Sequence, residues 1–184
     1  MLIKKMINLR RLALVASIAT MGSVALSSQV QAQTANVDFG GTIEATCLVN
    51  STTAGTLTNI INGTLDPLRL ETDTVGNISV SCNAGVKFAV TGIEDNGSVF
   101  TTKTFDNIDV ITAEVEDSST ANVATGSISP NGSGTNNLNE PGALQEGPIT
   151  ADNYRVKLSL QGNGDNTLPV GIYKIRVKVA LTPQ

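Results

Sequence analysis

Apolar and polar residues alternate over long stretches of this chain, and alternation with a period of two is typical of β-strands that have one buried face. The clearest case begins at residue 37, where the odd positions are Val37, Phe39, Gly41, Ile43, Ala45, Cys47 and Val49. The positions between them are mostly polar. The pattern predicts a strand over residues 37–49 with Cys47 on its buried face, and a bend or bulge at Gly40–Gly41.

Two further strands are predicted shortly afterwards. Residues 77–82 place Ile78, Val80 and Cys82 on one face, so that both cysteines point to the apolar side. Residues 86–93 alternate again, after a short connection at residues 83–85. The intervening region, residues 57–74, is less regular, and Pro67 argues against a central strand there.

The middle of the chain is dominated by polar and turn-forming residues. Residues 107–115 are apolar-rich, but the phase shifts near Val110–Ile111, which indicates either a bulge or two short strands. Residues 116–150 are crowded with Ser, Asn, Gly, Thr and Pro. We expect a long mobile hairpin or loop there, interrupted by one short strand around residues 121–128. Loops of this kind often carry binding surfaces.

The chain ends with two regular alternating segments. The first covers residues 154–160, and the second has the apolar positions Tyr173, Ile175, Val177, Val179 and Leu181. No helix of ordinary length is indicated after residue 32. About seven short strands separated by turn signals predict an all-β fold, an antiparallel sandwich of Greek-key type.

The N-terminus has the features of a secretory signal peptide. An apolar run over residues 12–26 is followed by Val30-Gln31-Ala32, which places small residues where a signal peptidase cleaves. The basic residues before the run are Lys4, Lys5, Arg10 and Arg11. A transmembrane anchor is the alternative, but no charged flank follows the run. We therefore predict a signal peptide at residues 1–32, cleavage after Ala32, and one exported domain over residues 33–184 with no membrane span.

Cleavage makes the remaining domain strongly acidic. The full chain has 12 basic and 16 acidic residues, and four of the basic residues but none of the acidic ones precede residue 33. The exported part therefore carries 8 bases against 16 acids, a net charge of −8, which excludes nucleic acid as a natural partner. Five of the eight bases lie on the outward faces of the last two predicted strands. They either discourage edge pairing or recognise an acidic partner.

The inventory of reactive side chains favours a structural or binding role over an enzyme. The chain has no His, the usual base for a Ser or Cys nucleophile. In an exported protein, Cys47 and Cys82 are expected to form a disulfide, and two free buried thiols are the alternative. The possible acid–base pairs, Glu94–Asp95 and Glu114/Glu116–Asp117, sit in or beside polar turns. Residues 94–96 and 163–166 lack the spacing of a calcium loop, so we expect no cofactor and no metal.

Three segments together resemble a known family of secreted subunits. Residues 37–49, with their Phe-Gly-Gly stretch and terminal cysteine, look like the first strand of pilins assembled by the chaperone–usher pathway. Residues 77–82 resemble the strand that carries the second pilin cysteine. Residues 171–179 resemble the C-terminal pilin strand, and even more the ending of spore coat protein U-like domains. The resemblance leaves residues 95–150 uncovered.

The resemblance implies a structural subunit of a surface fibre or of a secreted coat. Pilins have an immunoglobulin-like sandwich that lacks its seventh strand, and the resulting groove would lie beside Tyr173, Ile175, Val177, Val179 and Leu181. A periplasmic chaperone fills the groove during transit to an outer-membrane usher, and a donor strand from another subunit then replaces it at the cell surface. Nothing strand-like is expected after Leu181.

The expected donor is the segment 34–42, with Val37, Phe39 and Gly41 facing the groove. Only residues 33–36 precede the first predicted strand, which is short for a donor extension. A terminating subunit and a self-complete domain therefore stay open as alternatives. The alternative function is a monomeric secreted binding module, adhesin-like, whose specificity lies in residues 116–150.

Overall fold

The computed structural model describes residues 40–60, 69–101, 104–162 and 168–184. The predicted signal peptide lies outside these ranges, as do Val37 and Phe39. Residues 42–184 form one compact unit, and the other unit, residues 1–41, contributes only Gly40 and Gly41 to the described part.

All regular structure in the described ranges is β-structure, except for one short 3-10 helix, η1 (Phe105–Asn107). The strands are β1 (Cys47–Thr53), β2 (Thr56–Ile60), β3 (Arg69–Thr74), β4 (Gly76–Cys82), β5 (Val86–Asp95), β6 (Val99–Phe100), β7 (Ile108–Glu116), β8 (Asn122–Ile128), β9 (Ile149–Gly162), β10 (Gly171–Ile172) and β11 (Ile175–Pro183). No helix within the described ranges is long and apolar enough to cross a membrane. The all-β prediction is confirmed.

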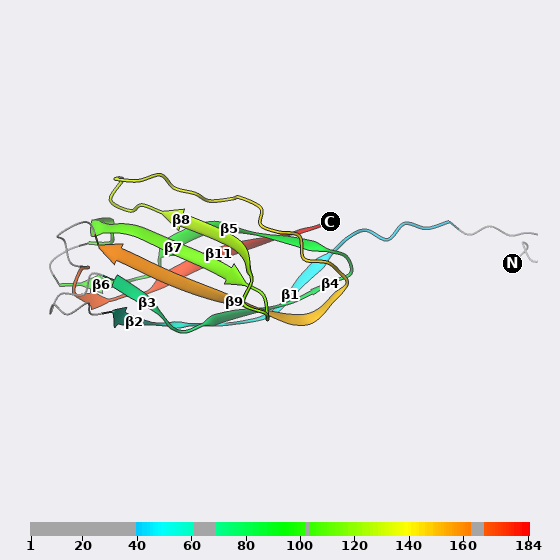
Figure 1. Cartoon of the computed structure of the whole chain (residues 1–184), viewed down its shortest axis with the longest axis horizontal. Coiled ribbons are helices and arrows are strands. Elements are labelled where there is room, and N and C mark those ends of the chain that lie inside the picture. The colour runs from blue at the N-terminus through cyan, green and yellow to red at the C-terminus, as the bar shows by residue number, and fades with distance from the viewer. Residues whose placement is uncertain (1–39, 61–68, 102–103, 163–167) are drawn as a thin grey trace, which may run out of the picture. The chain divides into compact units, whose positions relative to one another are not determined.

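The larger sheet is built around β9, the longest strand (Figure 1). β3 and β4 pair with one edge of β9, and β7 pairs with the other edge and carries β8 on its far side. β1 and β2 extend the sheet beyond β4 and β3, respectively. Only Val75 separates β3 from β4, and only Ala54–Gly55 separates β1 from β2. Each of these pairs therefore runs along the sheet almost as one interrupted strand.

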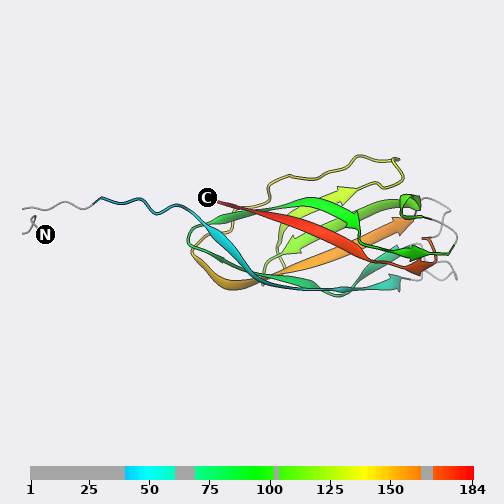
Figure 2. The same cartoon turned by 180° about the vertical axis from the view of Figure 1, so that it is seen from behind.

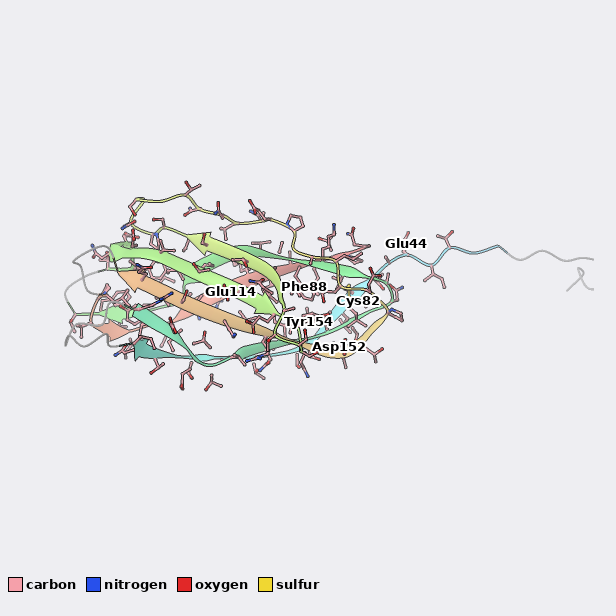
Figure 3. All side chains as sticks on the ribbon, viewed as in Figure 1. Glu44, Cys82, Phe88, Glu114, Asp152 and Tyr154 are labelled. Carbon is pink, nitrogen blue, oxygen red and sulfur yellow. A yellow bond between two sulfur atoms is a disulfide. The ribbon has the colours of Figure 1, made fainter. Side chains whose placement is uncertain are left out.

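The second layer is the antiparallel pair of β5 and β11, with the small β6–β10 pair at one end. In Figure 2, β11 (red) and the β1–β2 segment (cyan) run along the same side of the molecule. The two layers meet at Phe88 of β5 and Tyr154 of β9, whose ring centroids are 4.2 Å apart (Figure 3). The arrangement is a sandwich of two antiparallel layers around one core.

Branched aliphatic side chains fill this core, as expected for a chain with so few aromatic residues. The side chains with no exposure are Val80, Val86, Phe88, Val90, Ile108, Ile111, Ala113, Val115 and Leu160. They occupy alternate positions on β4, β5, β7 and β9 because side chains on a strand point to opposite faces in turn. The strands predicted over residues 77–82 and 86–93 correspond to β4 and β5, and the bulge predicted near Val110 is present between Ile108 and Val110.

One side of the sandwich is closed by an irregular segment, residues 137–145. Asn137 exchanges two backbone hydrogen bonds with Ser127 of β8. Farther along, the backbone N–H groups of Asn139, Gly142 and Gln145 donate to carbonyl oxygens of β5 at 2.8 Å. The segment thus covers the edge of β8 and the outer edge of β5, and it supplies partners for backbone groups that would otherwise be open to another chain. It lies within the region that was predicted to be a mobile loop.

Two sequence-based predictions need correction. Within the described part of the strand predicted over residues 37–49, residues 40–46 are not strand and β1 begins at Cys47. Ile43, expected to be buried, is 90% exposed, because an alternating segment forms a strand only where a partner edge is available. The region 57–74, expected to be irregular, contains β2 and β3 at its two ends. The short strand predicted near residues 121–128 is present as β8.

Candidate functional site: an open apolar groove

The outer edge of β11 and the edge formed by β1 and β2 have no partner strand in the described part of the molecule. β11 pairs with β5 on one edge only, and β1 and β2 pair only with β4 and β3. β11 also approaches β1 near the disulfide. These two free edges border the side of the sandwich opposite the one that residues 137–145 close.

The burial of β5 and β11 differs although both strands alternate and belong to the same ladder. On β5, the side chains of Val86, Phe88 and Val90 are completely buried. On β11, Val177 and Val179 are only half-buried. The difference lies in their neighbours: the outer edge of β5 is covered, whereas the outer edge of β11 is open. The core is therefore incomplete along β11.

A groove of about 840 Å³ lies between the two free edges. Its apolar lining is Ala54, Leu57, Leu70, Ile78, Val156, Leu158, Leu168, Pro169, Val170, Tyr173, Ile175, Val177 and Val179. The lining residues on the C-terminal side run from Tyr173 to Val179, a length of roughly 20 Å at the rise of a β-strand. That length suits an extended segment of about six residues, of which every second side chain would face the floor.

Four of the five residues predicted to form the groove strand line this groove, namely Tyr173, Ile175, Val177 and Val179. Leu181 packs against the core and is not among the lining residues. Tyr173 precedes β11, which begins at Ile175. The last strand also continues past Leu181, since Thr182 and Pro183 pair with Lys87 and Val86, respectively.

Most of the groove floor was not found by sequence reasoning. Leu57 of β2, Leu70 of β3 and Leu158 of β9 lie far apart in the chain, and sheet pairing brings them together. Leu57 and Leu70 are each one apolar residue between polar neighbours, which is a weak signal in strands of five and six residues. Only the alternation around Leu158 pointed to an inward side chain.

One end of the groove is held by an aromatic contact. The Tyr173 ring packs edge-on against Phe100, with 5.0 Å between the ring centroids. The Tyr173 hydroxyl donates a hydrogen bond to the Pro169 carbonyl oxygen. Burial raises the pKa of Tyr173 to about 12. Burial also raises the pKa of Tyr154, assisted by the negative charges of Asp152 and Asp117.

We expect both tyrosines of this chain to ionise at a higher pH than free tyrosine. A raised pKa means that the neutral phenol stabilises the fold below pH 10, and that this contribution is lost as the pH rises from about 10 towards about 12. Ultraviolet difference titration of the native protein should therefore show little tyrosinate formation near pH 10. In the Y154F variant Tyr173 is the only tyrosine, so the titration measures its phenol alone. Half-ionisation of that phenol near pH 10 would contradict the burial of Tyr173 at the groove end.

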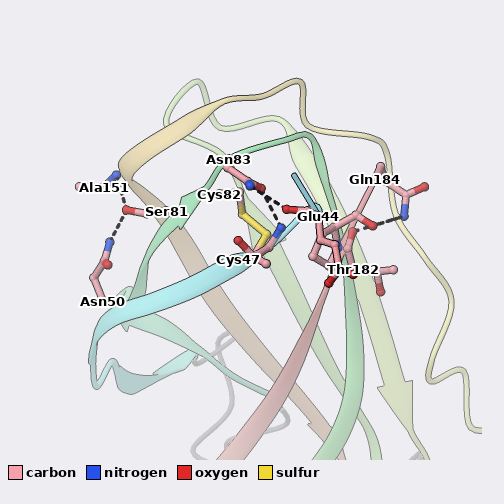
Figure 4. The surroundings of a disulfide bond; sticks show 11 residues. Glu44, Cys47, Asn50, Ser81, Cys82, Asn83, Ala151, Thr182 and Gln184 are labelled. Carbon is pink, nitrogen blue, oxygen red and sulfur yellow. Dashed lines mark hydrogen bonds between the residues drawn. A yellow bond between two sulfur atoms is a disulfide. The ribbon is translucent and has the colours of Figure 1, made fainter. Parts of the chain in front are cut away.

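The other end of the molecule is fixed by the predicted disulfide, which is present between Cys47 and Cys82 (Figure 4). Beside it, Asn83 holds the chain that precedes β1. The Thr46 N–H donates to the Asn83 side-chain oxygen at 2.7 Å, and the Asn83 side-chain amide donates to the Glu44 carbonyl oxygen at 2.8 Å. The chain is thus anchored up to Glu44, whereas Gly40 and Gly41 make no strand contact. Sequence reasoning treated Asn83 only as a turn residue.

Of the expected donor residues, only Gly41 lies in the described part of the chain. It is exposed and outside any strand. Val37 and Phe39 lie outside the described residues, so their role stays a prediction.

Four of the carboxylates considered for catalysis or calcium binding, those of Glu94, Asp95, Glu116 and Asp117, are engaged in turns or ion pairs. Glu94 pairs with Lys178, and Glu116 pairs with Lys157 at 2.6 Å. Hydrogen bonds from Ser98 lower the pKa of Asp95, and hydrogen bonds from Ser119 lower the pKa of Asp117. Among the residues that the structure describes, no three His, Cys, Asp or Glu side chains are grouped so that they could hold a metal ion. The turn at residues 163–166 lies outside the described ranges.

The groove is therefore the feature of this fold best suited to an interaction. It offers apolar side chains along its floor and unpaired backbone groups along its rims, the two features that an added β-strand requires. No protein-family model matches this chain, and neither the curated proteins nor the solved structures contain a significant match to it.

Proposed function

We propose that this protein is a structural subunit of a surface fibre or secreted coat, in which a strand from another copy completes each domain. The domain would then be an immunoglobulin-like Greek-key sandwich that lacks its last strand. The observation that carries the proposal is the apolar groove between the free edges of β1–β2 and β11. A domain with an uncovered core side and two free edges is suited to accept a strand.

Filling the groove would provide both burial and backbone pairing. An added strand would bury large apolar side chains of its own, each contributing roughly 1.5–3 kcal/mol. It would also cover the half-buried side chains of Ile175, Val177 and Val179. The unpaired backbone groups of β11 would gain partners, which removes an exposed edge prone to non-specific pairing.

The donor that we propose is the segment 34–42 of a second copy. Its alternate positions Val37 and Phe39 provide apolar side chains, and Gly40–Gly41 permits close approach of the backbone. Before assembly the groove would need a temporary occupant, which is the role of the proposed periplasmic chaperone. Export through the signal peptide and release at an outer-membrane usher belong to the same proposal.

Gel electrophoresis in SDS, with and without prior boiling, tests this proposal on protein taken from the native cell surface. We expect a ladder of multimers without heating and a single monomer band after boiling, because a strand buried in a groove dissociates slowly. A single monomer band in both lanes would contradict the proposal. Ligand screening would then address the alternative, a monomeric binding module.

The structure bears on that alternative through residues 116–150. Residues 137–145 are committed to covering β8 and β5, which supports an architectural role for that part. The turn around Ser129, Asn131 and Ser133 is fastened to Asp109 by side-chain hydrogen bonds. If the protein binds a ligand through this region, that turn is an exposed part that its own hydrogen bonds hold in place.

A further inference from the structure

The β6–β10 end of the molecule carries an exposed apolar patch. Val99 of β6 is 62% exposed, and its register partner Ile172 of β10 is 60% exposed. Val170, two residues before Ile172, is 64% exposed. Directly paired residues share a face, so Val99 and Ile172 form one surface, and the exposed Val170 lies just before β10 at the same end of the molecule. On the opposite face of this strand pair, Phe100 packs against Tyr173.

The other end of the molecule carries a second apolar patch. It surrounds the start of β1, where Ile43 is 90% exposed and Leu48 is 65% exposed. Figure 1 shows β6 at one end of the sandwich, and the chain that leads into β1 at the other. Exposed apolar patches at both ends of one molecule suit a head-to-tail contact between copies.

In an assembly whose grooves hold donor strands, the direction of the donor strand decides which ends of neighbouring molecules meet. Val170, Gly171 and Lys174 line the groove, so the groove opens at the β6–β10 patch. β11 pairs antiparallel with β5, and antiparallel ladders are slightly more stable than parallel ones, so we take the donor to pair antiparallel with the free edge of β11. Such a donor would run parallel to β1 and β2, which border the other side of the groove. β11 runs from the β6–β10 end towards the disulfide end (Figure 2). An antiparallel donor would therefore leave the groove at the β6–β10 end.

The length of the connecting chain then fixes which surfaces meet. If residues 34–42 fill the groove, only residues 43–46 separate them from Cys47 of the donating copy. These residues span at most roughly 18 Å when fully extended. Ile43 and Leu48 of the donating copy are therefore held close to Val99, Val170 and Ile172 of the accepting copy. Glu44 of the donor would also lie near Lys174 of the acceptor, a pair of opposite charge.

We infer that the patch Val99–Val170–Ile172 is a second subunit interface, which docks onto the Ile43–Leu48 end of the next copy of this chain. The inference rests on the proposed function, since it takes the donor position from it. The interface is heterologous: one patch meets a different patch, so that contacts repeat in one direction along the assembly. Burial of these exposed side chains would add to the energy of the donor strand and fix the angle between neighbours.

Site-specific photo-crosslinking in assembled protein tests the inference. A benzophenone amino acid at Ile172, and in a separate protein at Val99, should give covalent dimers whose crosslinked peptide contains residues 43–49 of the other copy. The same probe at Ile43 should reach the peptides around residues 99 and 172. A probe at Ser118, in the exposed turn between β7 and β8, is the matched control and should give at least tenfold less dimer.

The outcomes separate this inference from the proposed function. Heat-sensitive multimers with crosslinks from residue 172 to residues 43–49 support both. Multimers that form normally but crosslink elsewhere, or no more than the Ser118 control, overturn the second interface and leave strand donation standing. Absence of heat-sensitive multimers with every probe, and with the wild-type chain, overturns both.

Discussion

A V177D variant is expected to remain a folded monomer and to lose its multimers. In the isolated domain, the side chain of Val177 is half-buried in an open groove, where a carboxylate can keep water. In a filled groove the same carboxylate would be buried without a partner, which costs several kcal/mol. At 1.4 kcal/mol per tenfold change, we expect at least roughly a 100-fold loss of multimer. Unheated SDS gels and analytical ultracentrifugation measure the loss.

The control for this variant is T182D, which adds the same charge to the same strand. Thr182 is exposed and does not line the groove, so T182D should assemble as the wild type does. Circular dichroism should show that both variants are folded. Equal assembly of V177D and T182D would show that the groove near Val177 stays empty in the assembly.

Mixing two defective variants sharpens this prediction. V177D has an impaired groove and an intact donor segment, whereas F39D has an intact groove and an impaired donor. Neither should assemble alone, but the mixture should form heat-sensitive dimers and nothing larger. Long multimers in the mixture, or multimers of F39D alone, would exclude Phe39 as the groove-filling residue.

Removal of the disulfide is expected to have the largest effect on the stability of the domain itself. Cys47 and Cys82 are register partners on β1 and β4, 35 residues apart in the chain. Closing such a loop contributes about 3–4 kcal/mol in the chain-entropy model. The C47S/C82S double variant should lose that amount in urea unfolding and melt roughly 10 °C lower, since each kcal/mol is worth about 2–4 °C at this chain length.

Reduction of the wild type provides the matched comparison. Dithiothreitol should lower the stability of the wild type towards that of the double variant and leave the double variant unchanged. The single variants C47S and C82S should also be secreted in lower yield, because each leaves one unpaired thiol. Equal unfolding curves for wild type and double variant would show that the disulfide does not stabilise the domain.

Alternation identified the strands that form the core but not those that form its periphery. β4, β5 and β9 are long or bury every second side chain, so a period of two is visible in the sequence. β2 and β3 have five and six residues, and most of these residues are polar. Sheet pairing, rather than their own pattern, makes them strands. The floor of the groove was not predicted for the same reason, because Leu57 and Leu70 become neighbours only through that pairing.

The first predicted strand was placed too early for a related reason. Residues 37–46 alternate as well as any strand in the chain, but alternation indicates only a capacity for one-sided burial. Ile43 has that capacity and is 90% exposed. The closure by residues 137–145 was not predicted either, because it depends on backbone hydrogen bonds that residue types do not encode. The disulfide was predictable because both cysteines fell on apolar faces.

The closure of one side of the sandwich by residues 137–145 also limits the shape of any assembly. With the outer edge of β5 and the edge of β8 covered, each molecule in the proposed assembly would have one place to receive a strand and one segment to give. In polymer terms the monomer has a functionality of two, so growth yields an unbranched line, and a unit that cannot donate ends it. The same closure blocks edge-to-edge pairing at β5 and β8, which leaves the groove side as the place where another strand can add.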